Sequence, residues 1–153
     1  RRVTMLTIVN MLRLLLVFYS GLLYAQSTAT LSGRVLATLL AEAWEPLQRR
    51  DYHALRNLCG VAPVTRRSGK TSIILRRRAC HPRLANAVYF WAKCAVRRDL
   101  VSKSKYEALR ARGHGYARAL RSVADRLLNV ACAMLRDGTL FNRALAPEPL
   151  PID

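Results

Sequence analysis

A serine within a short basic stretch is the residue of this chain best placed to do chemistry. Ser68 precedes Gly69, and no acidic residue lies between Cys59 and Arg83. A serine hydroxyl can attack a phosphodiester when nearby cations stabilise the charge that develops on the phosphate. The basic residues of the stretch are Arg66, Arg67, Lys70, Arg76, Arg77, Arg78 and Arg83. Of these, Arg66, Arg67 and Lys70 are the candidates for the scissile phosphate, and no base is assigned.

Two plainer interpretations of Ser68 stay open. A serine beside a glycine is most often an ordinary turn residue. The residues RSGKTS also look like the end of a phosphate-binding P-loop, but that motif requires glycine where Val64 stands. What survives is the more general inference that backbone N–H groups at the Gly69 bend, together with Lys70, favour a bound phosphate oxygen.

The charge of the chain points to an anionic partner. Of its 153 residues, 26 are Lys or Arg and 9 are Asp or Glu, which gives a net charge of +17 and a pI near 11.1. Such an excess repels itself unless an anion neutralises it. Nucleic acid is the first candidate and an anionic membrane the second. The length suits one domain with one hydrophobic core.

The cysteines give little evidence of a metal site. None of the 4 forms a C-x-x-C pair, and Cys94 and Cys132 fall on apolar faces of expected helices. Buried, reduced thiols are therefore the preferred interpretation. A zinc site built on Cys80 and His81 is the weaker alternative, because adjacent ligands rarely clamp a metal.

The first 30 residues differ from the rest. Met5–Ala25 is strongly apolar and is interrupted by Asn10 and Arg13. It fits a signal or membrane anchor, an amphipathic helix on its own core, or a segment foreign to the domain. We expect residues 1–30 to be an apolar segment whose origin the sequence leaves open, residues 31–143 to be one domain, and the proline-rich residues 144–153 to be disordered.

The periodicity predicts a mostly α fold: a compact helical domain with a helical hairpin and a small basic loop resembling a β-hairpin. Apolar residues at three- and four-residue spacing mark the helices, and β-branched runs flank Ser68-Gly69. Pro46 is expected to end the first helix, Asp51 to cap the second, and Ser102 to cap the fourth. The expected helices are Gly33–Trp44, Tyr52–Leu58, Pro82–Arg98, Lys103–Arg112 and Tyr116–Arg136, with strands Val61–Thr65 and Thr71–Leu75.

With these motifs in view, the chain resembles the C-terminal domain of transposases of the insertion sequence 110 class (the IS 116 / IS 902 kind). The resemblance covers about residues 33–143 through a long ordered series of motifs. The matching segments are LATLLAEA (Leu36–Ala43), LCGVAPVTRRSGK (Leu58–Lys70), RRRACHPRLANAVYFWA (Arg76–Ala92), and Lys105–Phe141.

This resemblance implies DNA transposition by a recombinase in which Ser68 is the DNA-joining nucleophile. It also implies an N-terminal RuvC-like domain, absent from this sequence, whose four acidic residues bind a divalent metal such as Mg²⁺. No cofactor is expected in this chain itself. The implied partners are DNA, in some members a guide RNA, and further copies of the full-length enzyme. The expected location is the bacterial cytoplasm at the nucleoid, and a membrane partner is not expected.

The sequence departs from the family pattern before Leu36. Family members carry a Gly-x-Gly-Pro turn there, whereas this chain reads Leu31-Ser32-Gly33-Arg34. We expect a truncated copy that is inactive in isolation. The alternative function is a non-catalytic nucleic-acid binder that lacks the acidic domain, and a membrane-anchored basic protein is the third.

Overall fold

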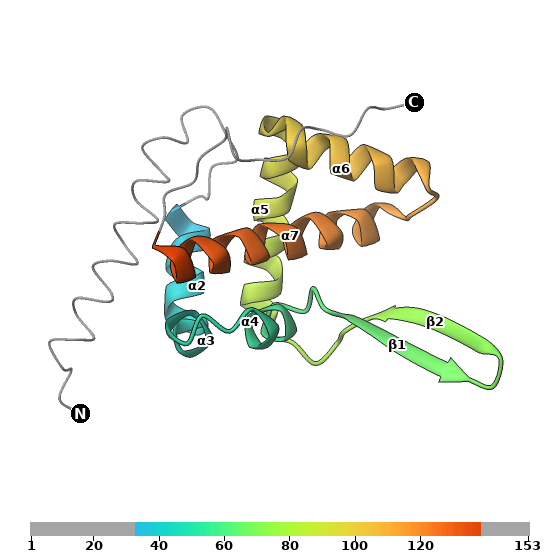
Figure 1. The fold of residues 1–153 in the computed structure, drawn as a ribbon, viewed down its shortest axis with the longest axis horizontal. Coiled ribbons are helices and arrows are strands. Elements are labelled where there is room, and N and C mark those ends of the chain that lie inside the picture. The colour runs from blue at the N-terminus through green and yellow to red at the C-terminus, as the bar shows by residue number, and fades with distance from the viewer. Residues whose placement is uncertain (1–32, 139–153) are drawn as a thin grey trace, which may run out of the picture.

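The computed structural model describes residues 33–138, which form a helical body with one projecting β-hairpin (Figure 1). The mostly α fold expected from the sequence is confirmed. In chain order the elements are α2 (Gly33–Glu42), α3 (Trp44–Gln48), α4 (Tyr52–Leu58), β1 (Pro63–Ser68), β2 (Thr71–Arg76), α5 (Pro82–Arg98), α6 (Leu100–Ala111) and α7 (Tyr116–Asp137). The expectations for residues 1–30 and 144–153 lie outside the described residues.

The structure adds a short helix, α3, between the two helices of the expected helical hairpin, and Pro46 does not end the first of them. The chain breaks at Ala43, and Pro46 lies in the first turn of α3 rather than ending α2. Proline is tolerated there because the first-turn N–H groups have no partner within the helix. The Asp51 carboxylate accepts a hydrogen bond from the Ala54 N–H at 2.9 Å, which confirms the predicted cap of α4.

Helix α5 is the centre of the body and contacts α2, α6 and α7. It begins at Pro82 and ends at Arg98, as the sequence predicts. The predicted cap of the next helix is wrong. Asp99 caps α6 by accepting from the Ser102 N–H at 2.9 Å, and the buried Ser102 hydroxyl also donates to Asp99. A carboxylate accepts these bonds better than a hydroxyl, so α6 starts earlier than expected.

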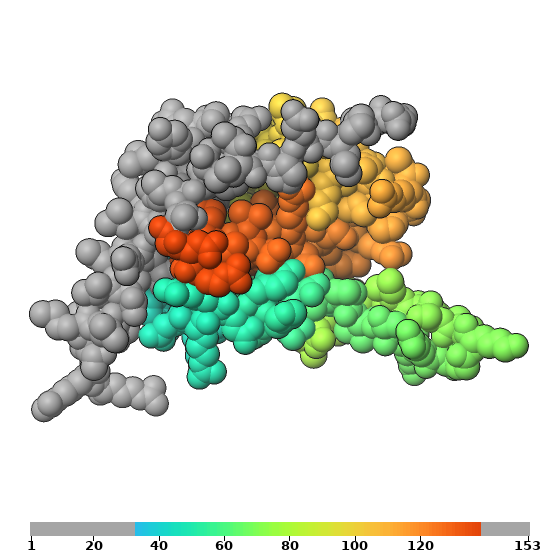
Figure 2. Space-filling view, in the orientation of Figure 1, coloured from blue at the N-terminus to red at the C-terminus, as the bar shows by residue number. Residues whose placement is uncertain are grey.

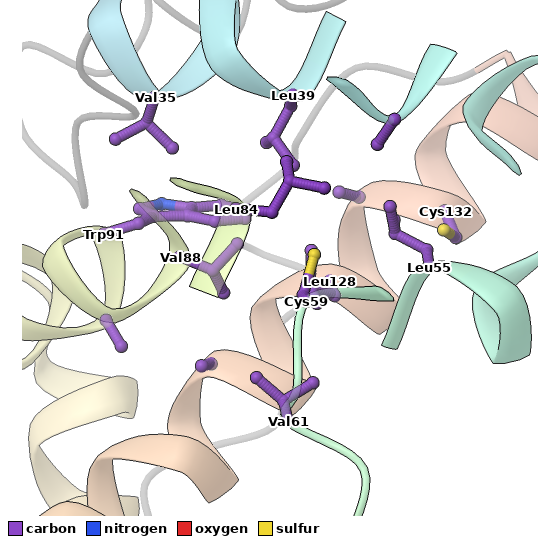
Figure 3. Close-up of a cluster of buried hydrophobic side chains, with 14 of the residues drawn as sticks. Val35, Leu39, Leu55, Cys59, Val61, Leu84, Val88, Trp91, Leu128 and Cys132 are labelled. Atoms are coloured by element: carbon purple, nitrogen blue, oxygen red, sulfur yellow. The ribbon is translucent and has the colours of Figure 1, made fainter. Parts of the chain in front are cut away.

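The hydrophobic core lies where α5 crosses α2 and α7. Figure 3 shows Leu84 and Val88 of α5 lying between Leu39 of α2 and Leu128 of α7. All four side chains are essentially inaccessible to solvent. The regular apolar spacing of α7 lets that helix bury a stripe along nearly its whole length. Gly138 then ends α7 in a left-handed conformation.

A charged network fastens α4 onto α7. The Arg56 guanidinium lies 2.6 Å from the Asp125 carboxylate, and the Tyr52 hydroxyl donates to the same carboxylate at 2.8 Å. Burial, and then the hydrogen bond to Asp125, raise the pKa of Tyr52 to about 12. Because these charged groups are partly buried, their hydrogen bonds fix the orientation of α4 against α7 as well as stabilising the contact between the two helices.

The β-hairpin stands apart from the helical body. Figures 1 and 2 show the two strands extending away from the helices, past the N-terminal start of α7. Every residue of β2 is exposed, and in β1 Val64 alone is partly buried. The helical body therefore supports a thin, basic, projecting hairpin of residues 63–76, which we call the arm.

Core packing predicts that alanine substitutions at two leucines will lower the free energy of unfolding by very different amounts. Leu84→Ala removes a fully buried side chain and is expected to lower the free energy of unfolding by about 2–5 kcal/mol. Leu100→Ala, at a position 61% exposed, is expected to change it by less than about 0.5 kcal/mol. Urea denaturation followed by circular dichroism measures both, and equal losses would contradict this description of the core.

Candidate nucleic-acid interface

Ser68 lies at the tip of the projecting hairpin. It is the last residue of β1 and pairs with Thr71, the first residue of β2, across a two-residue loop. Gly69 in that loop has φ of 57°, while Lys70 does not have a positive φ. Glycine at the first loop position matches a type II′ turn, whose twist suits a hairpin. The loop chemistry therefore places the serine hydroxyl at an exposed end.

The strand register decides which basic residues share a face with Ser68. Side chains alternate between the faces of a strand, so Arg66 lies on the same face as Ser68 and Arg67 on the opposite face. Arg67 pairs with Ser72. Lys70 occupies the turn beside Ser68. The sequence grouped Arg66, Arg67 and Lys70 around the serine, and the register separates Arg67 from the other two.

Apolar residues on this arm are unusually exposed. Ile73 is 54% exposed, Ile74 50% and Leu75 43%. Ile73 and Leu75 lie on the Ser68 face, and Ile74 lies on the other face. A two-stranded hairpin is at best marginally stable alone, and exposed apolar clusters commonly mark binding surfaces. The arm thus combines cations for a charged ligand with apolar side chains that the body does not cover.

The hairpin joins the helical body at residues 60–62 and 77–80, which we call its root. The root is held by a close contact between the Gly60 backbone and the Cys80 side chain. Gly60 has φ of +69°, and a Cβ atom placed on it would meet the Cys80 Cβ and Sγ atoms at 2.8 Å. The His81 N–H donates to the Leu58 carbonyl at 2.9 Å. These contacts bring the two ends of residues 60–80 together, which fixes where the arm leaves the body.

The remaining predicted basic residues are divided between the root and the body. Arg76 ends β2, and Arg77 and Arg78 follow it directly. The Arg77 Nε atom is buried and has no hydrogen-bond partner among the described residues. Arg83 instead lies in the first turn of α5, 3.1 Å from the Glu42 carboxylate. The structure therefore does not place Arg83 on the arm.

The sequence did not link two arginines of α7 to the basic stretch. Arg118 and Arg121 lie in the first turns of α7, and Arg121 is partly buried. Burial, and then the charges of Arg76 and Arg118, lower the pKa of Arg121. Sequence periodicity places both residues on a polar helix face, but no local pattern links them to Arg76.

The arm contains no residue that could serve as a base for Ser68. Residues 61–79 include neither histidine nor a carboxylate. His81 lies outside the strands, with its Nε2 atom 3.4 Å from Glu42. Across residues 33–138, no three His, Cys, Asp or Glu side chains come together to hold a metal ion. The divalent metal that the resemblance implies belongs to the RuvC-like domain and not to these residues.

The cysteines follow the prediction only in part. Cys59 and Cys132 are buried, and burial raises their pKa to about 12 and about 11 respectively, so these thiols are protonated and unreactive. Cys94 is exposed, contrary to its expected position on an apolar face. Cys94 lies on α5 and lines a groove between α2 and α5, together with Arg34, Phe90 and Trp91.

The chain belongs to the Transposase IS116/IS110/IS902 family, whose model matches residues 25–107, more than half of the sequence. It is 38% identical over 91 residues to the uncharacterized 42 kDa protein of insertion element IS900 from Mycobacterium paratuberculosis, covering 59% of this chain and 23% of that protein. In Streptomyces coelicolor it is 33% identical over 114 residues to the candidate transposase of the IS117 mini-circle, covering 72% and 28%.

Another relative in Streptomyces coelicolor is the uncharacterized 43.6 kDa protein of insertion element IS110, which is 36% identical over 110 residues, covering 71% of this chain and 27% of that protein. The chain thus spans about a quarter of the length of the curated relatives it matches. No solved structure matches it. Within the described part of the chain, none of the helices has the length and apolar character needed to cross a bilayer.

The contact at the hairpin root predicts unequal costs for two glycine substitutions. Gly60→Ala combines a left-handed backbone with a clash against Cys80, whereas Gly113→Ala has a similar φ of +79° and open space. Left-handed strain costs about 1–2 kcal/mol, so Gly113→Ala should lose about that much and Gly60→Ala clearly more. Equal urea midpoints for the two variants would show that the root is not tightly packed.

Proposed function

We propose that this chain is a DNA-binding domain of a transposase and that Ser68 is the nucleophile that joins it to a DNA strand during transposition. The observation that carries the proposal is the exposed tip of the arm, where Ser68 lies between Arg66 on its own face and Lys70 in the turn. Membership of the transposase family supports DNA as the substrate. The net charge of +17 supports it independently.

The proposed step is a phosphoryl exchange. The Ser68 Oγ atom attacks the phosphorus, an O–P bond to the protein forms, and the bond from phosphorus to one sugar oxygen breaks. The serine proton passes to a base outside residues 61–79, and the released sugar hydroxyl takes up a proton. Arg66 and Lys70 stabilise the charge on the non-bridging oxygens, since guanidinium and ammonium groups bind phosphate strongly.

The other basic residues have a positioning role in this proposal. Arg67 faces away from Ser68 and is assigned to a neighbouring phosphate rather than the scissile one. Arg76, Arg77 and Arg78 contact the backbone where the arm meets the body, and Arg83 is less available because it is paired with Glu42. Phosphate contacts of this kind fix register without reading sequence.

The whole enzyme needs more than this domain. We propose that a RuvC-like domain supplies the acidic residues, a divalent metal such as Mg²⁺ and the base. The metal would lower the cost of charge on the phosphate and its leaving oxygen. We further propose that the full-length enzyme acts as an oligomer, in some members with a guide RNA. The alternative of a non-catalytic binder is favoured by one observation, the lack of a base on the arm.

The role of Ser68 is tested by trapping the DNA–protein adduct. With the RuvC-like domain of a family relative supplied, we expect a denaturation-resistant adduct that Ser68→Ala lowers by about two orders of magnitude or more. Ser72→Ala is the matched control, because Ser72 is an exposed serine on the opposite face of the same arm. Adduct that persists in Ser68→Ala would remove Ser68 from this role.

Binding of DNA by the chain alone is a separate prediction. Between about 50 and 200 mM salt, we expect the affinity for duplex DNA to fall at least about a hundredfold, because each phosphate contact releases a counterion. Fluorescence anisotropy of a labelled duplex measures the dependence. An affinity independent of salt over this range would contradict a phosphate-binding arm.

A further inference from the structure

The strand register gathers aliphatic side chains of the arm on the face that carries Ser68. Residues directly opposite each other in the two strands share a face of the sheet. From tip to root, the pairs on the Ser68 face are Ser68 with Thr71, Arg66 with Ile73, and Val64 with Leu75. Because Ile73 and Leu75 are two residues apart on one strand, they form a continuous patch with Val64, which we call the apolar patch.

The opposite face of the arm has a different pattern. Its pairs are Arg67 with Ser72, Thr65 with Ile74, and Pro63 with Arg76. Ile74 is the only Ile, Leu or Val of the arm on that face, and its neighbours along the strand are Ser72 and Arg76. The two adjacent isoleucines are nearly equally exposed, at 54% for Ile73 and 50% for Ile74. The apolar patch is therefore a property of one face and not of the strand as a whole.

The helical body leaves the apolar patch open. Every residue of β2 is exposed, and Figure 2 shows the hairpin projecting beyond the helices. An exposed aliphatic cluster loses free energy to its contact with water, and such clusters commonly mark binding surfaces. Since the patch shares its face with Ser68, a molecule that meets the serine is well placed to cover the patch too.

The pairing of Ile73 with Arg66 restricts what can cover the patch. Directly opposite side chains have Cβ atoms about 4.5–5.5 Å apart, so a molecule that covers Ile73 also covers Arg66. A purely apolar partner would bury that guanidinium without a counterion, which is costly. A second copy of the arm would bring like charges together, because residues 61–79 contain no carboxylate. Duplex DNA instead offers apolar base surfaces beside phosphates.

We propose that Ile73 and Leu75 contact base edges in the major groove of the DNA beside the joined phosphate, and that the group they recognise is the C5 methyl of thymine. A two-stranded β-ribbon fits this groove, where that methyl is an apolar feature of the base edges. This inference rests on the proposed function for DNA as the ligand. It adds a preference among bases to a surface whose arginines contact only the backbone.

The geometry of the strand gives the distance from the joined phosphate. Ile73 and Leu75 lie two and four residues from Thr71, the partner of Ser68 at the tip. At about 3.4 Å per residue, these positions are about 7 and 14 Å along the arm. DNA rises about 3.4 Å per base pair, so an arm lying along the groove places the two side chains about two and four base pairs from the joined phosphate.

The first experiment compares an alternating A·T duplex with the same duplex in which uracil replaces thymine. Uracil keeps the base pairing and lacks the C5 methyl. We expect the parent chain to bind the thymine duplex about fourfold or more tightly, which is the effect of burying one methyl-sized group. Ile73→Ala should remove this preference. Ile74→Ala is the matched control and should retain it. Fluorescence anisotropy measures all four affinities for each salt concentration.

The salt dependence separates base contact from backbone contact. Ile73→Ala removes no charge, so we expect it to weaken binding of the thymine duplex by the same factor at every salt concentration. Arg66→Gln should instead reduce the slope of log affinity against log salt by about 0.9 and leave the preference for thymine over uracil unchanged.

Folding is controlled within the same set of variants. Ile73 and Ile74 are exposed and lie outside the core, so both alanine variants should keep the urea midpoint of the parent chain. Ile73→Thr and Ile74→Thr keep the β-branched side chain that a strand favours and carry the test if alanine disturbs the hairpin. Ile73→Thr is expected to lower the preference for thymine, and Ile74→Thr to retain it.

The outcomes separate this inference from the proposed function. A thymine preference that Ile73→Ala leaves intact, or that Ile74→Ala lowers equally, would overturn the base contact while leaving Ser68 as the nucleophile. Sedimentation that shows a change of oligomeric state in Ile73→Ala, with unchanged duplex binding, would overturn it in favour of a protein interface. Absence of binding to either duplex by the parent chain would overturn the proposed function itself.

Discussion

The contact between Gly60 and Cys80 is the constraint on which the rest of the structure depends. The left-handed glycine lets the end of α4 approach the start of α5 so closely that a methyl group would not fit. Because the His81 N–H also bonds to the Leu58 carbonyl, both ends of the arm are tied to the buried core. A hairpin with almost no packing of its own can then project in a defined direction.

The helical body and the arm divide the work of the domain. The body buries its apolar side chains between α2, α5 and α7 and uses most of its carboxylates for caps and ion pairs. The arm carries cations, a serine and exposed isoleucines, with no carboxylate to neutralise them. The combination explains how a small basic domain can stay folded while exposing uncompensated positive charge on the arm, where the proposed function places DNA.

Local chemistry made much of the fold predictable, and long-range packing accounts for the rest. Asp51 and Pro82 mark helix starts by mechanisms that need no tertiary structure, and Ser68-Gly69 between β-branched runs marks the hairpin. Pro46 was misassigned because proline is compatible with the first turn of a helix as well as with an end. The close approach of Gly60 to Cys80, which fixes where the arm leaves the body, joins residues that sequence spacing does not bring together.

Hydrogen–deuterium exchange of the chain with and without a saturating duplex tests the central claim most directly. The account predicts that DNA protects the backbone amides of residues 63–76 and leaves those of α3 unchanged. Protection confined to the groove between α2 and α5, which Arg34, Phe90 and Trp91 line, with unchanged exchange in the arm, would contradict it.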